Sequence, residues 1–468
     1  MEQFVAYLSL ALVALILGIY VRNIINRTWD LFSWRNLFLL GFMHFYCFSA
    51  YYMATGETLP EFLGLTTGGW AKLAAMMVLF LIIFLGCSSF AMRRRSWTRI
   101  VPKIELPVTA PALVASTLVL SILGLVFSIP FFNYFGVIAA QVRGQLGACA
   151  VGLATYYLVA RRFNPLAWLL FFSALGMGAV SSTVGLPGRR LLVGVMLAVP
   201  WMWYFVIWRY RPPTTNIIRV SIFFVAGVLG VIIYSPIRAG QEQRTEVEAT
   251  ISKRTDQFID LITNPRIDTK VIKYILYTDT VPNTLYILEN YPTNHQFMPL
   301  HGLYWLMANP IPRSIWPNKP EALGGILRDQ MRVVPNLGPG IIGHGWSEAW
   351  VFGVIYYAVF FGLLVGVVDR ASAERCWNPY FLAVFGGNLG NVLALPRGDT
   401  PLFVIQIIGG IVSSGGILYL LKSVSPVWAS FPLLQPPGTS DASEATPESP
   451  DAAPDHGDAS LATELQEA

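Results

Sequence analysis

Charged residues are scarce in this sequence, at only 13% of its 468 positions. A soluble domain carries about 25%, whereas here 54% of the residues are hydrophobic. This balance excludes a soluble fold and indicates an integral membrane protein. Tryptophan and tyrosine are frequent, and several, such as Trp208, Tyr210 and Trp350, stand at the ends of apolar runs, as in an interfacial aromatic belt.

Cysteine is also scarce, with four residues in the whole chain. Cys47, Cys87 and Cys149 lie in apolar runs and Cys376 lies in a short basic loop, so no disulfide framework is expected. The first ten residues lack the basic region of a cleavable signal peptide and lead directly into an apolar segment, which predicts a first helix that is retained. We detect no internal repeat and no nucleotide-binding motif.

Long apolar segments dominate the rest of the sequence. All but two are long enough to cross about 30 Å of hydrocarbon as a helix. They predict an all-α, polytopic membrane protein with about eleven transmembrane helices. The expected spans are 3–21, 36–54, 71–92, 108–129, 146–160, 166–182, 191–208, 220–234, 346–368, 379–395 and 402–421. The 146–160 and 220–234 segments are short, and a tilted or re-entrant element at either place would change the count.

Basic residues accumulate on one side of these spans. Sixteen Lys and Arg residues lie in the short connections of that side, which the positive-inside rule makes cytoplasmic. They are Arg22, Arg27, Arg35, Arg93, Arg94, Arg95, Arg99, Lys103, Arg161, Arg162, Arg209, Arg211, Arg219, Arg370, Arg375 and Lys422. The short connections opposite hold five, namely Lys72, Arg143, Arg189, Arg190 and Arg397. The amino terminus is therefore expected outside and the carboxyl terminus inside.

Four regions follow from this layout. Residues 1–234 hold the first eight helices, 235–345 form a large outer loop with amphipathic helices, and 346–421 hold the last three helices. A loop of about 110 residues far exceeds ordinary connections, so we expect it to carry function. Residues 430–468 are rich in Pro, Ser, Asp and Glu, which predicts a disordered acidic cytoplasmic tail. Without the eight acids of that tail, the helical body carries a net charge near +13, which suits anionic lipid headgroups or an anionic substrate.

The most distinctive segment runs from Asn309 to Pro320, and it contains four prolines. Prolines fix an extended, stiff path, which presents Arg313, Trp316 and Lys319 rigidly. A guanidinium can grip a diphosphate with paired hydrogen bonds, and an indole face suits the surface of a sugar. Loops of this composition also serve as plain structural braces, and both interpretations remain open.

The pattern Pro-Arg-x-x-Trp-Pro-x-Lys-Pro, the turn Gly338-Pro339-Gly340-Ile341-Ile342-Gly343 and the helix start after it resemble the bacterial O-antigen polymerase (Wzy-type) family. The close resemblance covers about 309–353, and the rest of the chain is similar in helix layout. The resemblance implies a GT-C-like membrane glycosyltransferase that polymerises undecaprenyl-diphosphate-linked oligosaccharide repeat units into a cell-surface polysaccharide. It also implies the bacterial inner membrane, an accessory chain-length regulator, no metal or other cofactor, and no nucleic acid.

Such a transfer needs cations beside the departing diphosphate and a base for the acceptor hydroxyl. The outer arginines that run against the positive-inside bias are candidates for the first task, or else they extend toward lipid phosphates. They are Arg143, Arg189, Arg190 and Arg238.

His344 is the leading candidate base, because it follows the glycine-rich turn and directly precedes the expected ninth span. Glu348 lies one helical turn later on the same face and is the alternative base, since the resembled family often has a carboxylate near this place. In a third interpretation, Ser347 or Glu348 only caps exposed amides at a helix start. His295 and His301 lie six residues apart in the loop, a spacing unlike that of a zinc pair.

Other functional classes compete with the polymerase. A flippase for the same lipid-linked oligosaccharide would also need many helices and basic clefts. Coupled carriers, however, usually place carboxylates near the middle of the membrane, and the expected spans carry essentially no Asp or Glu before Glu348. An O-antigen ligase or protein oligosaccharyltransferase would use the same donor, but we find no His-Asn motif in the loop. A non-catalytic scaffold for polysaccharide assembly is the remaining alternative.

Overall fold

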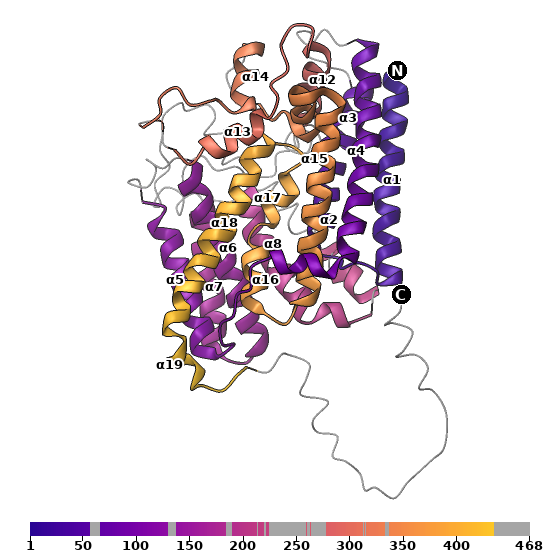
Figure 1. Ribbon diagram of the computed structural model, residues 1–468. Helices are drawn as coiled ribbons and strands as arrows, with labels where there is room; N and C mark the ends of the chain where they lie inside the picture. The colour runs from indigo at the N-terminus through magenta and orange to yellow at the C-terminus, as the bar shows by residue number, and fades with distance from the viewer. Residues whose placement is uncertain are drawn as a thin grey trace, which may run out of the picture.

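The computed structural model describes residues 1–56, 66–129, 137–183, 190–212, 214–219, 221–223, 259, 263, 278–311, 313, 315–332 and 337–434. Helices make up the fold, and no β-strand forms among these residues. They assemble into an elongated bundle with smaller helices at one end (Figure 1). The all-α membrane class predicted from composition is therefore confirmed.

Six helical segments are long and apolar enough to cross a membrane. They are α1 (Glu2–Asn26), the continuous run α2–η1–α3 (Trp34–Phe42, Met43–Phe48 and Ser49–Thr55), α4 (Thr67–Arg93), α7 (Pro165–Thr183), α15 (Gly340–Glu374) and α18 (Thr400–Leu421). Shorter or partly described helices accompany them, namely α5 (Ala110–Val126), α6 (Val137–Ala160) and α8 (Arg190–Val206). The predicted span at 220–234 lies almost entirely outside the described residues.

One predicted span is wrong as a continuous helix. Residues 379–395 form two short helices, α16 (Pro379–Gly386) and α17 (Leu389–Ala394), with a break at Gly387 and Asn388. Both helices are buried against other helices, so their free backbone groups are enclosed by protein rather than by lipid. Apolar composition predicted the burial but not the break.

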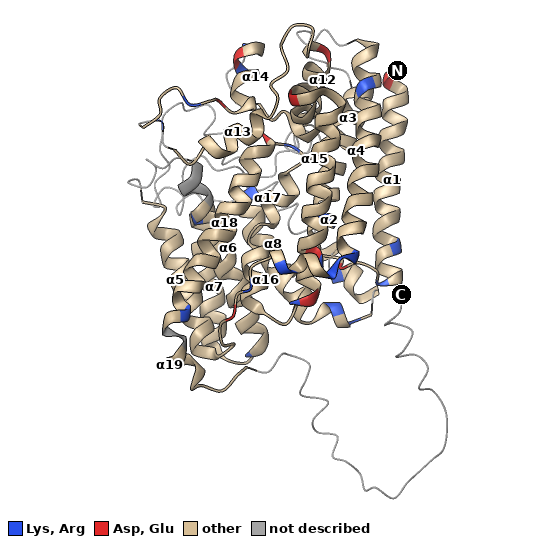
Figure 2. Ribbon diagram, viewed as in Figure 1, with Lys and Arg blue, Asp and Glu red and all other residues tan. Residues whose placement is uncertain are grey.

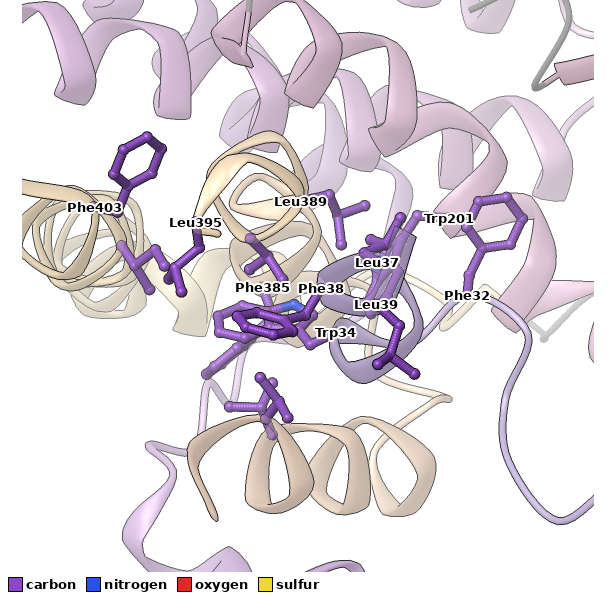
Figure 3. Close-up of a cluster of buried hydrophobic side chains, with 14 of the residues drawn as sticks. Phe32, Trp34, Leu37, Phe38, Leu39, Trp201, Phe385, Leu389, Leu395 and Phe403 are labelled. Atoms are coloured by element: carbon purple, nitrogen blue, oxygen red, sulfur yellow. The ribbon is translucent and has the colours of Figure 1, made fainter. Parts of the chain in front are cut away.

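The two short helices lie in a core of large apolar side chains (Figure 3). The ring centroids of Trp34 in α2 and Phe385 in α16 are 5.8 Å apart. Trp201 of α8 is fully buried, and its indole N–H donates to the carbonyl oxygen of Leu382 at 2.9 Å. This core joins the amino-terminal and carboxyl-terminal thirds of the chain.

Lys and Arg residues gather at the end of the bundle where α1, α4 and α15 finish (Figure 2). Several are neutralised locally there, as in the Arg209–Asp30 ion pair at 2.8 Å. Asp369 of α15 accepts hydrogen bonds from the backbone N–H groups of Trp34 and Arg35 at 2.7 and 3.0 Å. This carboxylate therefore caps the start of α2 and fixes it to α15.

The opposite end carries the helices of the large loop. They are α12 (Thr280–Asn290), α13 (His301–Ala308) and α14 (Leu323–Met331). Together with the starts of α15 and α18, they form what we call the loop end of the bundle (Figure 1).

Helices α4 and α15 pack closely through glycines. A Cβ added to Gly362 would lie 2.8 Å from the carbonyl oxygen of Phe84, and one added to Gly366 would lie 2.5 Å from that of Ser88. Small residues four apart allow this backbone approach, which is typical of helix pairs in membranes. Because Gly362 faces Phe84 and Gly366 faces Ser88, the two helices run in the same direction.

We expect Gly366→Ala to destabilise the protein by roughly 1–3 kcal/mol, since the added methyl group forces the two helices apart. Gly416→Ala in α18 is the matched control, because its Cβ would meet nothing within 4 Å and it should be neutral or slightly stabilising. Thermal unfolding of both variants in detergent measures the difference. Equal unfolding temperatures would contradict the assigned packing.

Candidate functional site

The first turns of α15 hold a histidine between two carboxylates. His344 Nε2 lies 3.2 Å from Glu348 Oε1, and His344 Nδ1 lies 3.4 Å from Asp399 Oδ1. The three residues are 0%, 4% and 6% exposed, respectively. The expectation that His344 and Glu348 share a helix face is therefore confirmed, and Asp399 completes what we call the His344 cluster.

Helix α15 begins earlier than the sequence predicts. It starts at Gly340 rather than near 346, so His344 lies inside the helix and not in the turn before it. Gly340 has φ +71°, a conformation that glycine adopts without strain. The backbone N–H groups of Gly340 and Ile341 donate to the carbonyl oxygens of Arg397 and Pro396 at 3.1 and 3.0 Å. These bonds fix the start of α15 beside the loop that delivers Asp399.

A backbone break follows Glu348 directly. Ala349 and Trp350 depart from helical geometry, and Trp350 has φ +53°, which is unusual for a bulky residue. The break folds α15 on itself, because a Cβ on Gly353 would lie 1.9 Å from the carbonyl oxygen of Gly345. Strained backbone of this kind persists only where the surrounding structure enforces it, and it concentrates at functional sites.

The break also brings Tyr357 to the cluster. Its hydroxyl donates to Glu348 Oε1 at 3.2 Å, and its ring meets that of His344 edge to face with centroids 5.5 Å apart. Glu348 therefore receives a neutral donor as well as the imidazole. Each donor helps to stabilise a buried carboxylate.

Both carboxylates also bind the large loop. Glu348 Oε1 accepts a short hydrogen bond from the backbone N–H of Gly302, at the start of α13. Asp399 Oδ2 accepts one from the N–H of Gly324, at the start of α14, at 3.2 Å. Asp399 is also the N-cap of α18 but makes no capping bond to its own helix. Its side chain is committed to His344 and α14 instead.

The imidazole ring of His344 lies between two carboxylates but forms no well-aligned hydrogen bond with either of them. Both imidazole nitrogens lie beside carboxylate oxygens, although the ring N–H directions miss good hydrogen-bond angles. The interaction of the ring with the two carboxylates is therefore electrostatic rather than directional. An imidazole and two carboxylates in contact are groups that can accept a proton from a hydroxyl group.

Two of the four predicted outer arginines, Arg143 and Arg190, lie among the described residues. Arg190 is the first residue of α8, and its guanidinium lies 4.5 Å from the ring centre of Phe403, one turn after Asp399 in α18. Arg143 lies within α6 and is 2% exposed. Arg189 and Arg238 lie outside the described residues.

The proline-rich segment makes contacts within the loop itself. Lys319 Nζ donates to the carbonyl oxygens of Asn309 and Ile311 at 3.1 and 3.0 Å. The pKa of Lys319 is lowered, mainly by its partial burial and to a smaller extent by the positive charge of nearby Arg313. Arg313 donates to the carbonyl oxygen of Pro317 at 3.2 Å. Trp316 meets Tyr304 edge to face at 6.3 Å. These contacts fit a structural brace, and the binding role remains a prediction.

The other loop histidines have partners of their own. His301 Nε2 lies 2.9 Å from the carbonyl oxygen of Glu321, and His295 Nε2 lies 3.0 Å from the Tyr286 hydroxyl. Partial burial lowers the pKa of His295. Across the described ranges, no group of three His, Cys, Asp or Glu side chains has the geometry to hold a metal ion.

No family model, curated protein or solved structure matches this chain. The resemblance to O-antigen polymerases therefore rests on the motif at 309–353 and on the helix layout. What the site can do has to be argued from its own residues.

Sequence reasoning missed Asp399 and Tyr357. Asp399 stands in Arg397-Gly398-Asp399-Thr400-Pro401, a short connection on the same predicted side as His344. An acid between two apolar spans is a usable signal, but its partner in another connection is not visible in sequence spacing. Tyr357 is hidden because a regular helix, at about 100° per residue, would place its side chain on the opposite side of the helix from that of Glu348, and only the break brings the two together.

We expect Asp399→Asn to lower thermal stability, because it leaves the buried His344 with one anionic neighbour and weakens the bond to Gly324. The loss should be roughly 1–3 kcal/mol. Glu321→Gln is the control, since the Glu321 side chain is 45% exposed and exposed pairs contribute little. Thermal unfolding in detergent distinguishes the two. An unchanged unfolding temperature for Asp399→Asn would show that the cluster does not hold the loop.

Proposed function

We propose that this protein is a membrane glycosyltransferase that polymerises undecaprenyl-diphosphate-linked oligosaccharide repeat units into a cell-surface polysaccharide. The observation that carries the proposal is the buried His344 cluster beneath the large loop. It supplies proton acceptors at one end of a membrane bundle, next to the motif that resembles the polymerase family. The finer layout of about eleven spans and a GT-C-like arrangement is part of the same proposal.

The charge distribution supports an orientation for this reaction. Lys and Arg residues gather at the end of the bundle opposite the loop end (Figure 2), and connections rich in such residues stay in the cytoplasm. We therefore place the loop end and the amino terminus on the outer face of a bacterial inner membrane. The carboxyl terminus then lies in the cytoplasm.

The proposed chemistry is a direct, inverting transfer. The cluster takes the proton of the acceptor sugar hydroxyl, and the resulting oxygen attacks the anomeric carbon of the donor. The bond from that carbon to the lipid diphosphate breaks, and its electron pair leaves with the diphosphate. Because both ring nitrogens of His344 already face carboxylates, Glu348 or Asp399 is the better first acceptor of the proton, and His344 holds the pair in place.

Cations near the leaving group complete the mechanism. Arg190 is the best-placed described candidate, because its guanidinium contacts the ring of Phe403, which lies one turn after Asp399 in α18. A guanidinium suits paired contacts to phosphate oxygens. Substrate must displace the amides of Gly302 or Gly324 to reach the buried carboxylates, so the loop has to shift during the reaction cycle.

We expect Glu348→Gln to reduce the long polysaccharide ladder by about 100-fold or more, the usual effect of losing a proton acceptor. The assay is a gel of surface and lipid-linked glycans from cells in which the variant replaces the native protein. His295→Gln is the control, because this loop histidine contacts Tyr286 rather than the cluster. Membrane levels of each variant must be equal for the comparison.

The same gel separates the competing classes. Loss of the ladder with single repeat units still exported supports a polymerase. Full-length polymer accumulating on its lipid carrier would indicate a ligase, and units trapped inside the cell would indicate a flippase. An unchanged ladder with Glu348→Gln would remove the cluster from the mechanism.

Arg190 allows a separate test of the leaving-group contact. We expect Arg190→Ala to lose most polymer and Arg190→Lys to recover only part, because lysine lacks the paired donors of guanidinium. Arg328→Ala is the comparison, since Arg328 forms an ion pair with Asp329 on α14 and is not a predicted site residue. Equal polymer from Arg190→Ala and the native chain would exclude a role at the diphosphate.

A further inference from the structure

After His301 at its start, helix α13 is apolar on all sides, which is unusual for a helix at the end of a bundle. Its inner side presents Gly302, Trp305 and Ala308, which are buried. There it packs over the start of α18 and the His344 cluster, since a Cβ on Gly302 would lie 2.7 Å from Pro401. A short helix with an apolar inner side normally shows polar residues on its outer side.

The outer side of α13 is apolar instead. Its exposed side chains recur at helical spacing and continue into the following loop. They are Leu300, Leu303, Tyr304, Met307, Ile311 and Ile315, and we call them the α13 outer face. The exposure is large, reaching 73% for Met307 and 74% for Ile315. Large exposed apolar side chains that cluster in this way mark a site of interaction with a protein or a membrane.

Helix α14 provides an internal comparison. It belongs to the same loop and is also held to the cluster by a backbone amide. Its outer side, however, carries Arg328 and Asp329, which form an ion pair at 2.7 Å. Figure 1 places α14 farther from the membrane-crossing helices than α13. The two helices therefore present surfaces suited to different media, water for α14 and an apolar phase for α13.

We propose that α13 is an interfacial helix whose outer face lies in the bilayer, at the boundary between headgroups and acyl chains. Helix α13 packs on the start of α18, and exposed apolar residues such as Ile408 follow farther along α18, which is long and apolar enough to cross a membrane. Tyr304 and Trp316 supply the aromatic pair typical of this boundary. Arg313, half exposed between Ile311 and Ile315, supplies a cation for lipid phosphates.

This placement connects the membrane to the His344 cluster. The backbone N–H of Gly302, in the first turn of α13, donates to Glu348. Lipid that holds α13 in the interface therefore also holds a partner of the buried carboxylate. The inference depends only on the membrane class of the protein, and it stands whether or not the proposed glycosyl transfer is correct.

The test measures how deeply α13 and α14 lie in the bilayer. A dansyl amino acid is incorporated at Met307, and separately at Asp329 as the control, in the otherwise unchanged full-length chain. Each protein is reconstituted into vesicles of phosphatidylcholine and phosphatidylglycerol, with acyl chains that are either plain or brominated near the glycerol end. Bromine quenches only nearby fluorophores, so we expect a loss of fluorescence at 307 and none at 329.

Three outcomes would overturn the inference. Quenching at neither position would leave the α13 outer face outside the bilayer. Quenching at both positions would show that the whole loop sinks into lipid, against the contrast with α14. A blue-shifted but unquenched probe at 307 would indicate cover by protein, such as a second copy of the chain. Elution volume in detergent confirms that each protein is folded, and Ile315 serves as a second probe position if the 307 protein misfolds.

Discussion

The contact of His344 with Glu348 and Asp399 is the constraint on which the loop end of the structure depends. It joins α15 to α18, two helices whose starts are 60 residues apart in sequence. The same two carboxylates accept the amides that begin α13 and α14. Burying three ionisable groups is costly unless each retains its partners. The loop helices and the cluster therefore stabilise one another, and in the proposed reaction part of the loop has to move before substrate reaches the carboxylates.

The break in α15 makes this arrangement possible. A regular helix through Ala349 and Trp350 would carry Tyr357 away from Glu348, and the positive φ of Trp350 costs conformational energy. That cost is offset by the close approach of Gly345 and Gly353, where no side chain intervenes. Glycines are thus required at two kinds of place in this helix, where it folds on itself and where it packs against α4. Neither requirement follows from hydropathy, which reads the whole segment as one apolar helix.

Composition and periodicity were sufficient for the class of fold and for most of the long helices, because hydrocarbon imposes length and apolarity on every span. The break within 379–395 was not predictable, since its short helices are enclosed by protein and carry the same apolar residues as a continuous span. At the site, helical spacing predicted the meeting of His344 and Glu348, which lie in one segment. Asp399 was missed because its approach is set by tertiary packing of α18 beside α15. The proposed roles of Arg143, Arg313, Trp316 and Lys319 remain predictions, while Arg189 and Arg238 lie outside the described residues.

The two loop helices give the cluster a position between two media. Glu348 is bound by α13, whose outer face is apolar, and Asp399 is bound by α14, whose outer face is charged. If α13 lies among lipid headgroups, the cluster lies between a lipid-facing wall and a water-facing wall. The proposed reaction needs this placement, because its donor is a diphosphate anchored in lipid and its acceptor is a sugar hydroxyl in water. A proton acceptor exposed to bulk water would be screened, whereas one enclosed by both helices acts at low dielectric, where directed charge has the greatest effect on a developing leaving group.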